Sequence, residues 1–236
     1  EKYCFRNCDA IMYKEGKGVL DLLPKDYNLN GKPGFYMSIY CLKEWFYKCK
    51  KNEKLSSLDG EIHIVNPSAF YGGESLIYNS MIPYITKIIK QKIHLHFYVS
   101  GNIEEVKAKG DKEVALNNKK LMKYFHIHKF VPPEKLSEEI CKYDFGLYLI
   151  HYTKLVNMKF ASYTSGNKIS SYLEAGIPFI VKEENKLNSD LVKKEGIGVA
   201  VENIENIRKI LEKFNQREAE KKIMKFYQNT SENYLE

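Results

Sequence analysis

The sequence predicts an α/β protein built on a doubly wound parallel sheet, with helices at its C-terminal end. Short apolar stretches of strand length recur from Glu61 onward, and segments of helix length separate them. The stretches are continuously apolar, which is typical of parallel strands covered on both faces. Right-handed crossovers between such strands place helices on both sides of the sheet. Ligands of such sheets bind beyond the carboxyl ends of the strands, so the residues after each strand are the functional candidates.

Six strands are expected after residue 60, and they cover residues 62–65, 93–99, 125–130, 145–150, 177–181 and 198–201. Proline at the first turn and glycine or proline after the last turn indicate where helices begin and end. The helices expected on these signals end near Lys92, run from Pro132 to about Tyr143, and cover residues 167–174, about 203–214 and 216–233. A charged segment fills residues 103–124.

The first 60 residues are less regular and form a section of their own. A short strand is expected over 9–13, and an amphipathic stretch over 19–23 is ended by Pro24. An apolar run follows at 35–40, and a helix is expected over 42–54. We place the boundary at residue 60, so that residues 61–236 form the main domain.

The composition excludes several classes of protein. The chain has 236 residues, of which 44% are hydrophobic, with 18 tyrosines, so it can bury a core and is not a disordered chain. A membrane span needs about 20 apolar residues, and the longest runs here are a handful; no signal peptide is visible. The net charge is +7, but lysines and acids are interleaved. We therefore expect a solvated surface with a weak preference for anions, and no nucleic-acid partner.

The cysteines do not form a metal-binding pattern. There are five of them, and Cys4 and Cys8 lack a second pair at zinc-ligand spacing. Free thiols in a reducing cytoplasm are the expectation, with no metal site.

Two loops carry candidate phosphate-binding residues. Gly72 and Gly73 follow the first strand, where paired glycines let backbone N–H groups approach a phosphate; an ordinary tight turn explains them equally well. Before the helix at 167–174, Ser165 is a natural N-cap, Gly166 keeps the helix start open, and Lys168 adds a positive charge. A pyrophosphate fits this second site, and a solvated lysine at a helix start is the alternative.

The segment Asn167-Lys168-x3-Tyr172-Leu173-x-Ala175-Gly176-x-Pro178 and the strand after it resemble the signature of GT-B glycosyltransferases, in their C-terminal nucleotide-sugar-binding domain. Three other segments resemble elements of that domain and occur in the same order. They begin at Phe130, Tyr143 and Glu195. The resemblance covers residues 61–236. Residues 9–40 look like the last strand and helix before the interdomain linker of such enzymes.

The resemblance implies a Rossmann-like donor-binding half that holds a nucleoside-diphosphate sugar as substrate, without a metal or other cofactor. Lys168 and His151 are the catalytic candidates, since His151 lies just beyond the strand at 145–150. The residues expected to contact the nucleotide are Gly72, Gly73, Ser100, Gly101, Phe130, Val131, Ser165, Gly166, Asn167, Lys168 and Ser171.

The chain departs from the family pattern at two places. Many members carry a glutamate for the ribose hydroxyls where this chain has Ser171, which can make only one such bond. Glu174 lies one turn later, and a surface or packing role is favoured for it over a substitute ribose contact. The Arg/Lys pair that many retaining members carry after the first strand is also missing, although positive charge on the leaving group is a large catalytic effect.

The other histidines are expected to be structural. His94 and His96 share one face of a strand, as do His126 and His128. No third ligand or carboxylate partner can be assigned from the sequence, so buried or edge histidines are favoured over metal ligands.

The leading hypothesis is therefore the donor half of a glycosyltransferase in glycan or glycolipid synthesis. Its partners would be a nucleotide sugar, an acceptor glycan or lipid-linked glycan, and an N-terminal acceptor domain or partner subunit, since the chain starts at Glu1. A cytoplasmic place is expected. For the aromatic and basic stretch 45–51, contact with the inner membrane face or with a partner domain is one option, and an ordinary amphipathic surface helix is favoured. The alternatives are a non-catalytic nucleotide-binding or scaffold module of the same fold, or one subunit of a split glycosyltransferase.

Overall fold

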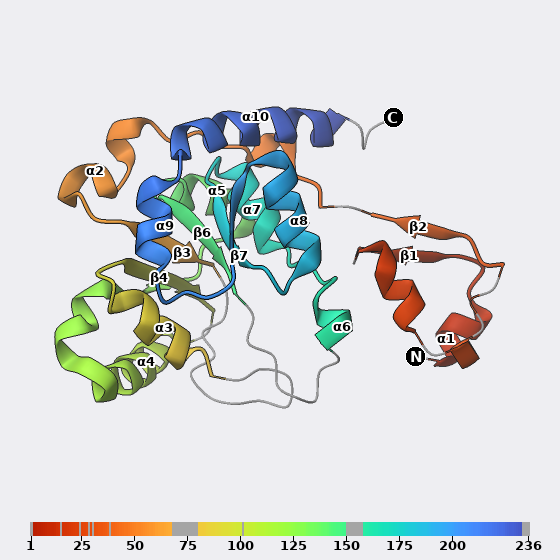
Figure 1. Ribbon diagram of the computed structural model, residues 1–236, viewed down its shortest axis with the longest axis horizontal. Coiled ribbons are helices and arrows are strands. Elements are labelled where there is room, and N and C mark those ends of the chain that lie inside the picture. Colours follow the sequence, from red (N-terminus) through yellow and green to blue (C-terminus); the bar gives the residue numbers. More distant parts are fainter. Residues whose placement is uncertain are drawn as a thin grey trace.

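The computed structural model has a six-stranded parallel sheet at its centre, with helices on both faces (Figure 1). It describes all residues except 1, 15, 24, 28, 30, 38, 68–79, 101, 150–157 and 233–236. The strands are β3 (His63–Asn66), β4 (His94–Val99), β5 (Phe125–Lys129), β6 (Phe145–Tyr148), β7 (Phe179–Lys182) and β8 (Gly198–Val201). The predicted α/β class with a doubly wound, Rossmann-like sheet is confirmed.

The strand order is β5-β4-β3-β6-β7-β8, and every pair is parallel. The chain starts at β3, builds outward to β5, then returns to the other side of β3 and builds outward to β8. The direction of winding therefore reverses between β3 and β6. In open parallel sheets this reversal opens a crevice at the carboxyl ends of the two strands, where ligands bind.

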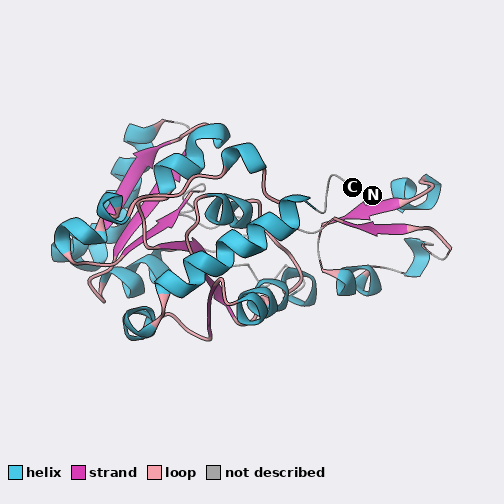
Figure 2. Cartoon of the chain, turned by 90° about the horizontal axis from the view of Figure 1, so that it is seen from above, coloured by secondary structure: helices cyan, strands magenta, loops and turns pink. Residues whose placement is uncertain are grey.

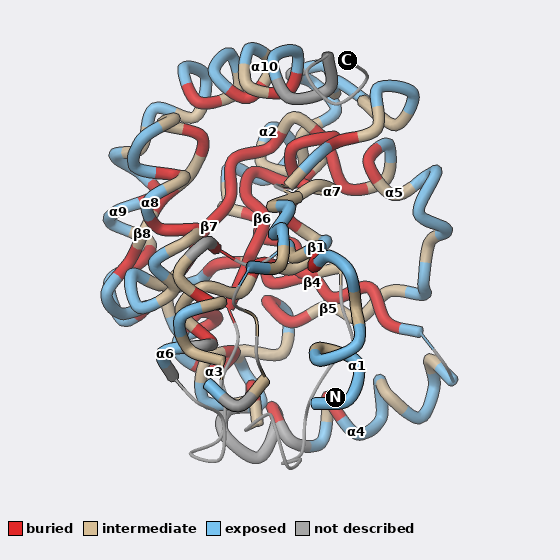
Figure 3. The backbone as a smooth tube through the Cα atoms, turned by 90° about the vertical axis from the view of Figure 1, so that its right-hand side faces the viewer, coloured by how far each residue is buried: buried red, intermediate tan, exposed pale blue. Residues whose placement is uncertain are grey.

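Two hydrophobic clusters fill the two faces of the sheet, because neighbouring strand residues point in opposite directions. Ile64 packs into the cluster with α3 (Ile82–Ile89), α4 (Ile103–Asn118) and α9 (Ile207–Lys213). Val65 packs into the other cluster, with α5 (Pro133–Ile140), α7 (Lys168–Glu174), α8 (Lys186–Glu195) and α10 (Gln216–Glu232). Figure 3 shows the buried strands running between these layers.

The segment 42–54 is not the helix that the sequence predicts. Only short 3-10 helices form there, at Lys43–Trp45 and Lys51–Glu53, before the short α2 (Ser56–Asp59). Its backbone is bound instead by the last residue of α7: the Leu42 N–H donates to the Glu174 carboxylate at 2.9 Å, and the Tyr47 N–H donates to the Glu174 carbonyl at 2.8 Å. Phe46 packs on Tyr227 of α10, with ring centroids 4.7 Å apart. Tertiary contacts therefore replace helical hydrogen bonds, and the segment runs across the domain as a strap.

The N-terminal section holds a small sheet of two parallel strands, β1 (Ile11–Tyr13) and β2 (Gly34–Tyr36), beside the large one (Figure 2). The helix α1 (Lys2–Asn7) and 3-10 helices at Lys17–Leu22 and Lys25–Tyr27 accompany these strands. The Gly16 N–H donates to the carbonyl of Tyr163 at 2.9 Å, which links this section to the segment between α6 (Met158–Ala161) and α7. The division at residue 60 stays a prediction.

None of the helices in the described part of the chain is long and apolar enough to cross a membrane.

Candidate functional site

Lys168 lies where the winding of the sheet reverses. It is the first residue of α7, and its Nζ donates a hydrogen bond of 3.1 Å to Oδ1 of Asn66, the last residue of β3. The same Nζ lies 5.6 Å from the centre of the ring of Tyr148, the last residue of β6. The lysine thus joins the carboxyl ends of the two central strands, which is where its role as a ligand-binding residue was predicted.

Burial lowers the pKa of the Lys168 ammonium to about 8, because the charged form loses hydration in this position. At neutral pH the ammonium is still mostly protonated. An anion bound beside it would restore the lost charge stabilisation and raise the pKa again. A buried cation in this position suits an anionic ligand such as a phosphate better than a neutral one.

Gly166 is required by the ring of Tyr148. A Cβ atom at Gly166 would lie 2.8 Å from Cε2 of Tyr148, which is closer than carbon atoms approach in folded proteins. The glycine lets the aromatic ring pack under the loop that leads into α7. Glycine at position 166 is therefore favoured for two reasons: the close packing of Tyr148 and the open helix start that the sequence suggested.

A pocket connects this loop with the N-terminal section. One wall consists of Ser165, Gly166, Asn167 and Ser170, and the other consists of Lys14, Met37, Ile39 and Tyr40. Its cavity volume is about 60 Å³. Three residues predicted to contact a nucleotide thus line one pocket. Lys14 was not predicted, although its place directly after β1 is the signal that would have found it.

Ser165 does not cap α7, contrary to the prediction. Its side chain is buried, and the hydroxyl donates to Oδ1 of Asn188 in α8 at 3.0 Å. The helix begins at Lys168, and Asn167 at the N-cap position makes no side-chain capping bond. Because Asn188 accepts the hydrogen bond from the Ser165 hydroxyl and donates another from its amide to the carbonyl of Thr164, these two contacts fix the loop to α8.

The remaining predicted contacts lie at the ends of other strands. Ser100 is exposed directly after β4. Phe130 follows β5 with 52% of its surface exposed, and its N–H donates to the carbonyl of Val99 at 2.9 Å. Val131 packs against the core. Four predicted residues lie outside the described part of the chain: Gly72, Gly73, Gly101 and His151.

Glu174 acts as a packing residue, as the sequence analysis favoured. It is buried on α7, and its carboxylate accepts the N–H of Leu42 from the strap. Burial raises the pKa of this carboxyl, and the hydrogen bond from Leu42 partly opposes the rise. Ser171 is half-buried on the same helix.

The histidines on β4 and β5 have partners that the sequence did not reveal. His63 on β3 binds His96, and Asp59 of α2 binds His63. These contacts add a fifth histidine, His63, and a carboxylate, Asp59, to the two predicted pairs.

Comparisons with known proteins agree with the architecture. The family model of the glucosyltransferase 3-like C-terminal domain matches residues 84–233, which is more than half of the chain. No curated protein sequence matches.

Solved glycosyltransferases share the fold at low sequence identity. The structure of TarM superposes with a TM-score of 0.61 at 16% identity, covering 99% of this chain and 45% of TarM. WaaG, a glycosyltransferase involved in lipopolysaccharide biosynthesis, gives 0.56 at 11%, covering 92% of this chain and 58% of WaaG. HepE of Anabaena, in complex with UDP, gives 0.58 at 11%, covering 98% of this chain and 65% of HepE. This chain thus spans about half to two thirds of the length of each of these structures.

Proposed function

Because the chain belongs to the glucosyltransferase 3-like C-terminal domain family, we propose that it is the donor-binding half of a glycosyltransferase. It would hold a nucleoside-diphosphate sugar beyond the carboxyl ends of β3 and β6. The observation that carries this proposal is Lys168, whose Nζ lies at the carboxyl ends of both central strands. A diphosphate is the ligand that suits a buried cation at the reversal point of a parallel sheet.

The reaction breaks the bond between the anomeric carbon and the distal phosphate oxygen, and forms a bond from that carbon to an acceptor hydroxyl oxygen. The hydroxyl proton passes to a base, and the nucleoside diphosphate leaves with the bonding electrons. Negative charge therefore grows on the distal phosphate in the transition state. Lys168 stabilises that charge, and Lys14 adds a second cation in the neighbouring pocket lined by Ser165, Gly166 and Asn167.

The nucleoside would lie across the carboxyl ends of β4 and β5. In the strand order these two strands are on the side of β3 that faces away from β6. Ser100 and Phe130 are exposed there, and an exposed aromatic ring at a strand end is suited to stack on a base. Uridine is the first base to test, since HepE was solved with UDP and with UDP-glucose. The nucleotide sugar would be the donor substrate, with no resident cofactor.

The acceptor would approach from the N-terminal section, because residues of that section form the second wall of the pocket. A glycan or lipid-linked glycan is the proposed acceptor, bound by a preceding domain or a partner subunit. We place the reaction in the cytoplasm, at the inner face of the membrane. All five cysteines are free thiols, which fits a reducing compartment.

A nucleotide panel on the purified chain tests the proposal. UDP, GDP, ADP and CMP are added separately, and binding is measured by calorimetry together with the shift of the melting temperature. We expect one nucleoside diphosphate to bind and stabilise the chain. Failure of all four to bind would contradict the donor-site proposal. Binding without sugar transfer in the presence of the acceptor half would favour the non-catalytic module, for which Ser171 in place of glutamate is the supporting observation.

A further inference from the structure

Five histidines gather on one face of the sheet, on the three neighbouring strands β3, β4 and β5. His63 begins β3, His94 and His96 lie on β4, and His126 and His128 lie on β5. The parallel register places His63 opposite His94 and His96 opposite His126. The rings of each opposed pair stack, with centroids 4.5 Å apart in the first pair and 4.2 Å apart in the second.

Hydrogen bonds join the rings diagonally between strands. Nδ1 of His63 lies 3.0 Å from Nε2 of His96, and Nδ1 of His96 lies 2.9 Å from Nε2 of His128. Nδ1 of His94 lies 2.9 Å from Nε2 of His126. In each of these bonds, one ring nitrogen carries the proton and donates, and the other accepts with its lone pair.

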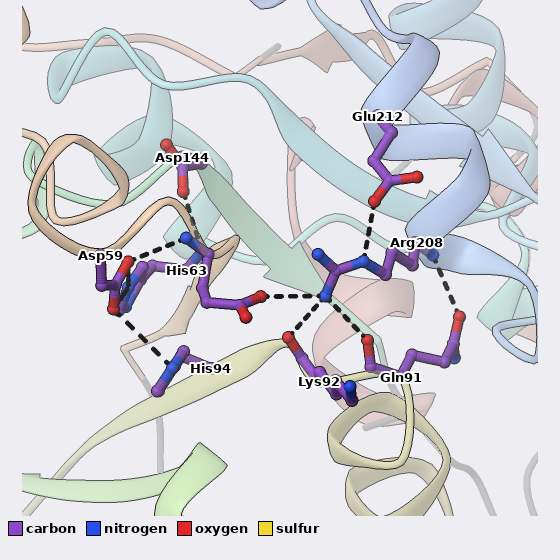
Figure 4. Close-up of polar contacts among 9 residues, drawn as sticks. Asp59, His63, Gln91, Lys92, His94, Asp144, Arg208 and Glu212 are labelled. Carbon is purple, nitrogen blue, oxygen red and sulfur yellow. Dashed lines mark hydrogen bonds and ion pairs between the residues drawn. The ribbon is translucent and has the colours of Figure 1, made fainter.

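A carboxylate closes one end of this cluster. Asp59, from the end of α2, lies 3.0 Å from Nε2 of His63 and 3.9 Å from Nε2 of His94 (Figure 4). Its side chain is 42% exposed, whereas His63 is buried. Figure 4 also shows the backbone N–H of His63 bound to Asp144, at 2.8 Å, which fixes the start of β3. The histidines therefore have a polar, accessible edge on one side and a rigid strand behind them.

We propose that His63, His94 and His96 form a binding site for a divalent transition-metal ion of the zinc type. Each of the three offers a ring nitrogen, and these nitrogens lie within 4.8 Å of one another. Nitrogen ligands of a tetrahedral zinc ion lie about 2.0–2.1 Å from the metal, so small rotations of the rings bring the three nitrogens into reach. The ion replaces the hydrogen bond between His63 and His96. The proton on Nε2 of His96 moves to Nδ1 of the same ring, whose N–H then donates to Nε2 of His128, and His128 keeps its own proton on Nδ1, so every ring stays neutral and no proton is lost.

The surrounding groups match those that usually orient metal-bound histidines. When Nδ1 of His63 binds the ion, its Nε2–H stays bound to the Asp59 carboxylate, which gives a carboxylate–histidine–metal arrangement. When Nε2 of His96 binds the ion, its Nδ1 stays bound to His128. The carboxylate also offsets part of the charge of the ion.

This site is separate from the proposed nucleotide site. His63 and His94 begin their strands, whereas Lys168 contacts the carboxyl-terminal residues of β3 and β6. The ion would join β3 to β4 at their amino ends and stabilise the half of the sheet that carries β4 and β5. The sequence had offered no third ligand because His63 belongs to a strand with a single histidine.

Cobalt binding to the tag-free full chain tests the site, because tetrahedral cobalt with nitrogen ligands has a visible absorption spectrum. The chain is stripped with a chelator and titrated with Co²⁺, and Zn²⁺ is then added as competitor. We expect one Co²⁺ per chain, displaced by Zn²⁺, and a higher melting temperature with Zn²⁺ but not with Mg²⁺. No visible spectrum in the wild-type chain would overturn the proposal.

Variants assign the ligands. His63→Gln and His96→Gln each remove a ligand and should weaken Co²⁺ binding by at least about tenfold. Asp59→Asn, at a largely exposed side chain, should weaken it by about tenfold because His63 loses its orienting carboxylate. It also gives a readout if a histidine variant fails to fold. The matched control is Cys4→Ser with Cys8→Ser, which removes two thiols of the N-terminal section and should leave binding unchanged. Equal binding by the wild type and by Asp59→Asn, His63→Gln and His96→Gln would overturn the site, as would loss of binding only in the cysteine variant.

Discussion

Nζ of Lys168 lies 3.1 Å from Oδ1 of Asn66, so the first residue of α7 is hydrogen-bonded to the last residue of β3 across 102 positions of sequence. This contact places a cation at the point where a doubly wound sheet reverses its direction. The same lysine lies against the ring of Tyr148 at the end of β6. The proposed binding of the diphosphate depends on this position of Lys168 more than on any other feature.

The lowered pKa of Lys168 predicts a pH dependence of stability. The unfolded chain keeps this lysine protonated up to about pH 10.5, whereas the folded chain loses the proton near pH 8. Between these values the unfolded state binds more protons, so the free energy of unfolding rises with pH. We expect Lys168 to contribute a rise of about 2 kcal/mol between pH 8 and pH 10.

Urea unfolding of the wild type and of Lys168→Met at both pH values measures this contribution. The difference between the two proteins removes the effect of other groups that titrate in the same range. Identical pH dependence of wild type and variant would show that the lysine is well solvated in the folded chain.

Gly166→Ala is expected to disturb the pocket through Tyr148. The added methyl group would lie 2.8 Å from Cε2 of the ring, so the ring or the loop must move. Overpacking of this kind costs about 1–3 kcal/mol, and nucleotide affinity should fall as well. Combining Gly166→Ala with Tyr148→Ala should recover part of the loss, since the clash is then removed. Chemical unfolding and nucleotide titration of the two single variants and the double variant measure this coupling, and strict additivity would contradict it.

Glu174→Ala and Glu174→Gln separate a packing role from a ribose-binding role. The alanine variant leaves the half-buried N–H of Leu42 without its acceptor, which costs about 1–3 kcal/mol of stability. Glutamine keeps an acceptor oxygen and should retain most of the stability. Both folded variants should bind nucleotide with the affinity of the wild type. A specific loss of nucleoside affinity, with stability unchanged, would instead assign Glu174 to the ribose.

Phe130→Ala tests the proposed base contact. The ring is more than half exposed after β5, so its removal should leave stability nearly unchanged. Loss of base stacking should weaken nucleotide binding by about 1–3 kcal/mol, and Phe130→Trp should retain binding. Calorimetric titration of both variants with UDP is the measurement. Unchanged affinity in Phe130→Ala would place the base elsewhere.

The sequence predicted the sheet well because buried parallel strands carry a strong local signal. All six strands were expected within a few residues of their observed bounds, and β8 was expected at Gly198–Val201. The helix α8 was not assigned, since its start depends on Asn185, whose side chain accepts the N–H of Asn188. The helix expected over 42–54 does not form, because a distant residue binds the backbone of this segment. The N–H groups of Leu42 and Tyr47 donate to Glu174, which lies more than 100 positions away in the sequence.

The positions of the candidate site residues could be predicted where they follow from the order of strands and helices along the chain. They could not be predicted where they follow from contacts between side chains of separate elements. Lys168 and Gly166 follow from their place before a helix in a parallel sheet. The turn of Ser165 toward Asn188 could not be predicted, since both side chains come from separate elements. The contact of His63 with His96 likewise depends on which strands are neighbours, information that a list of strands does not contain.

The most direct test of the account is calorimetry of UDP and UMP binding to the wild type, to Lys168→Ala and to Lys209→Ala, an exposed lysine on α9. Because Lys168 is proposed to bind the distal phosphate, its loss should weaken UDP binding by at least about tenfold and UMP binding much less. Lys209→Ala should bind both as the wild type does. Equal weakening of UDP and UMP in Lys168→Ala would contradict the assignment of this lysine to the diphosphate.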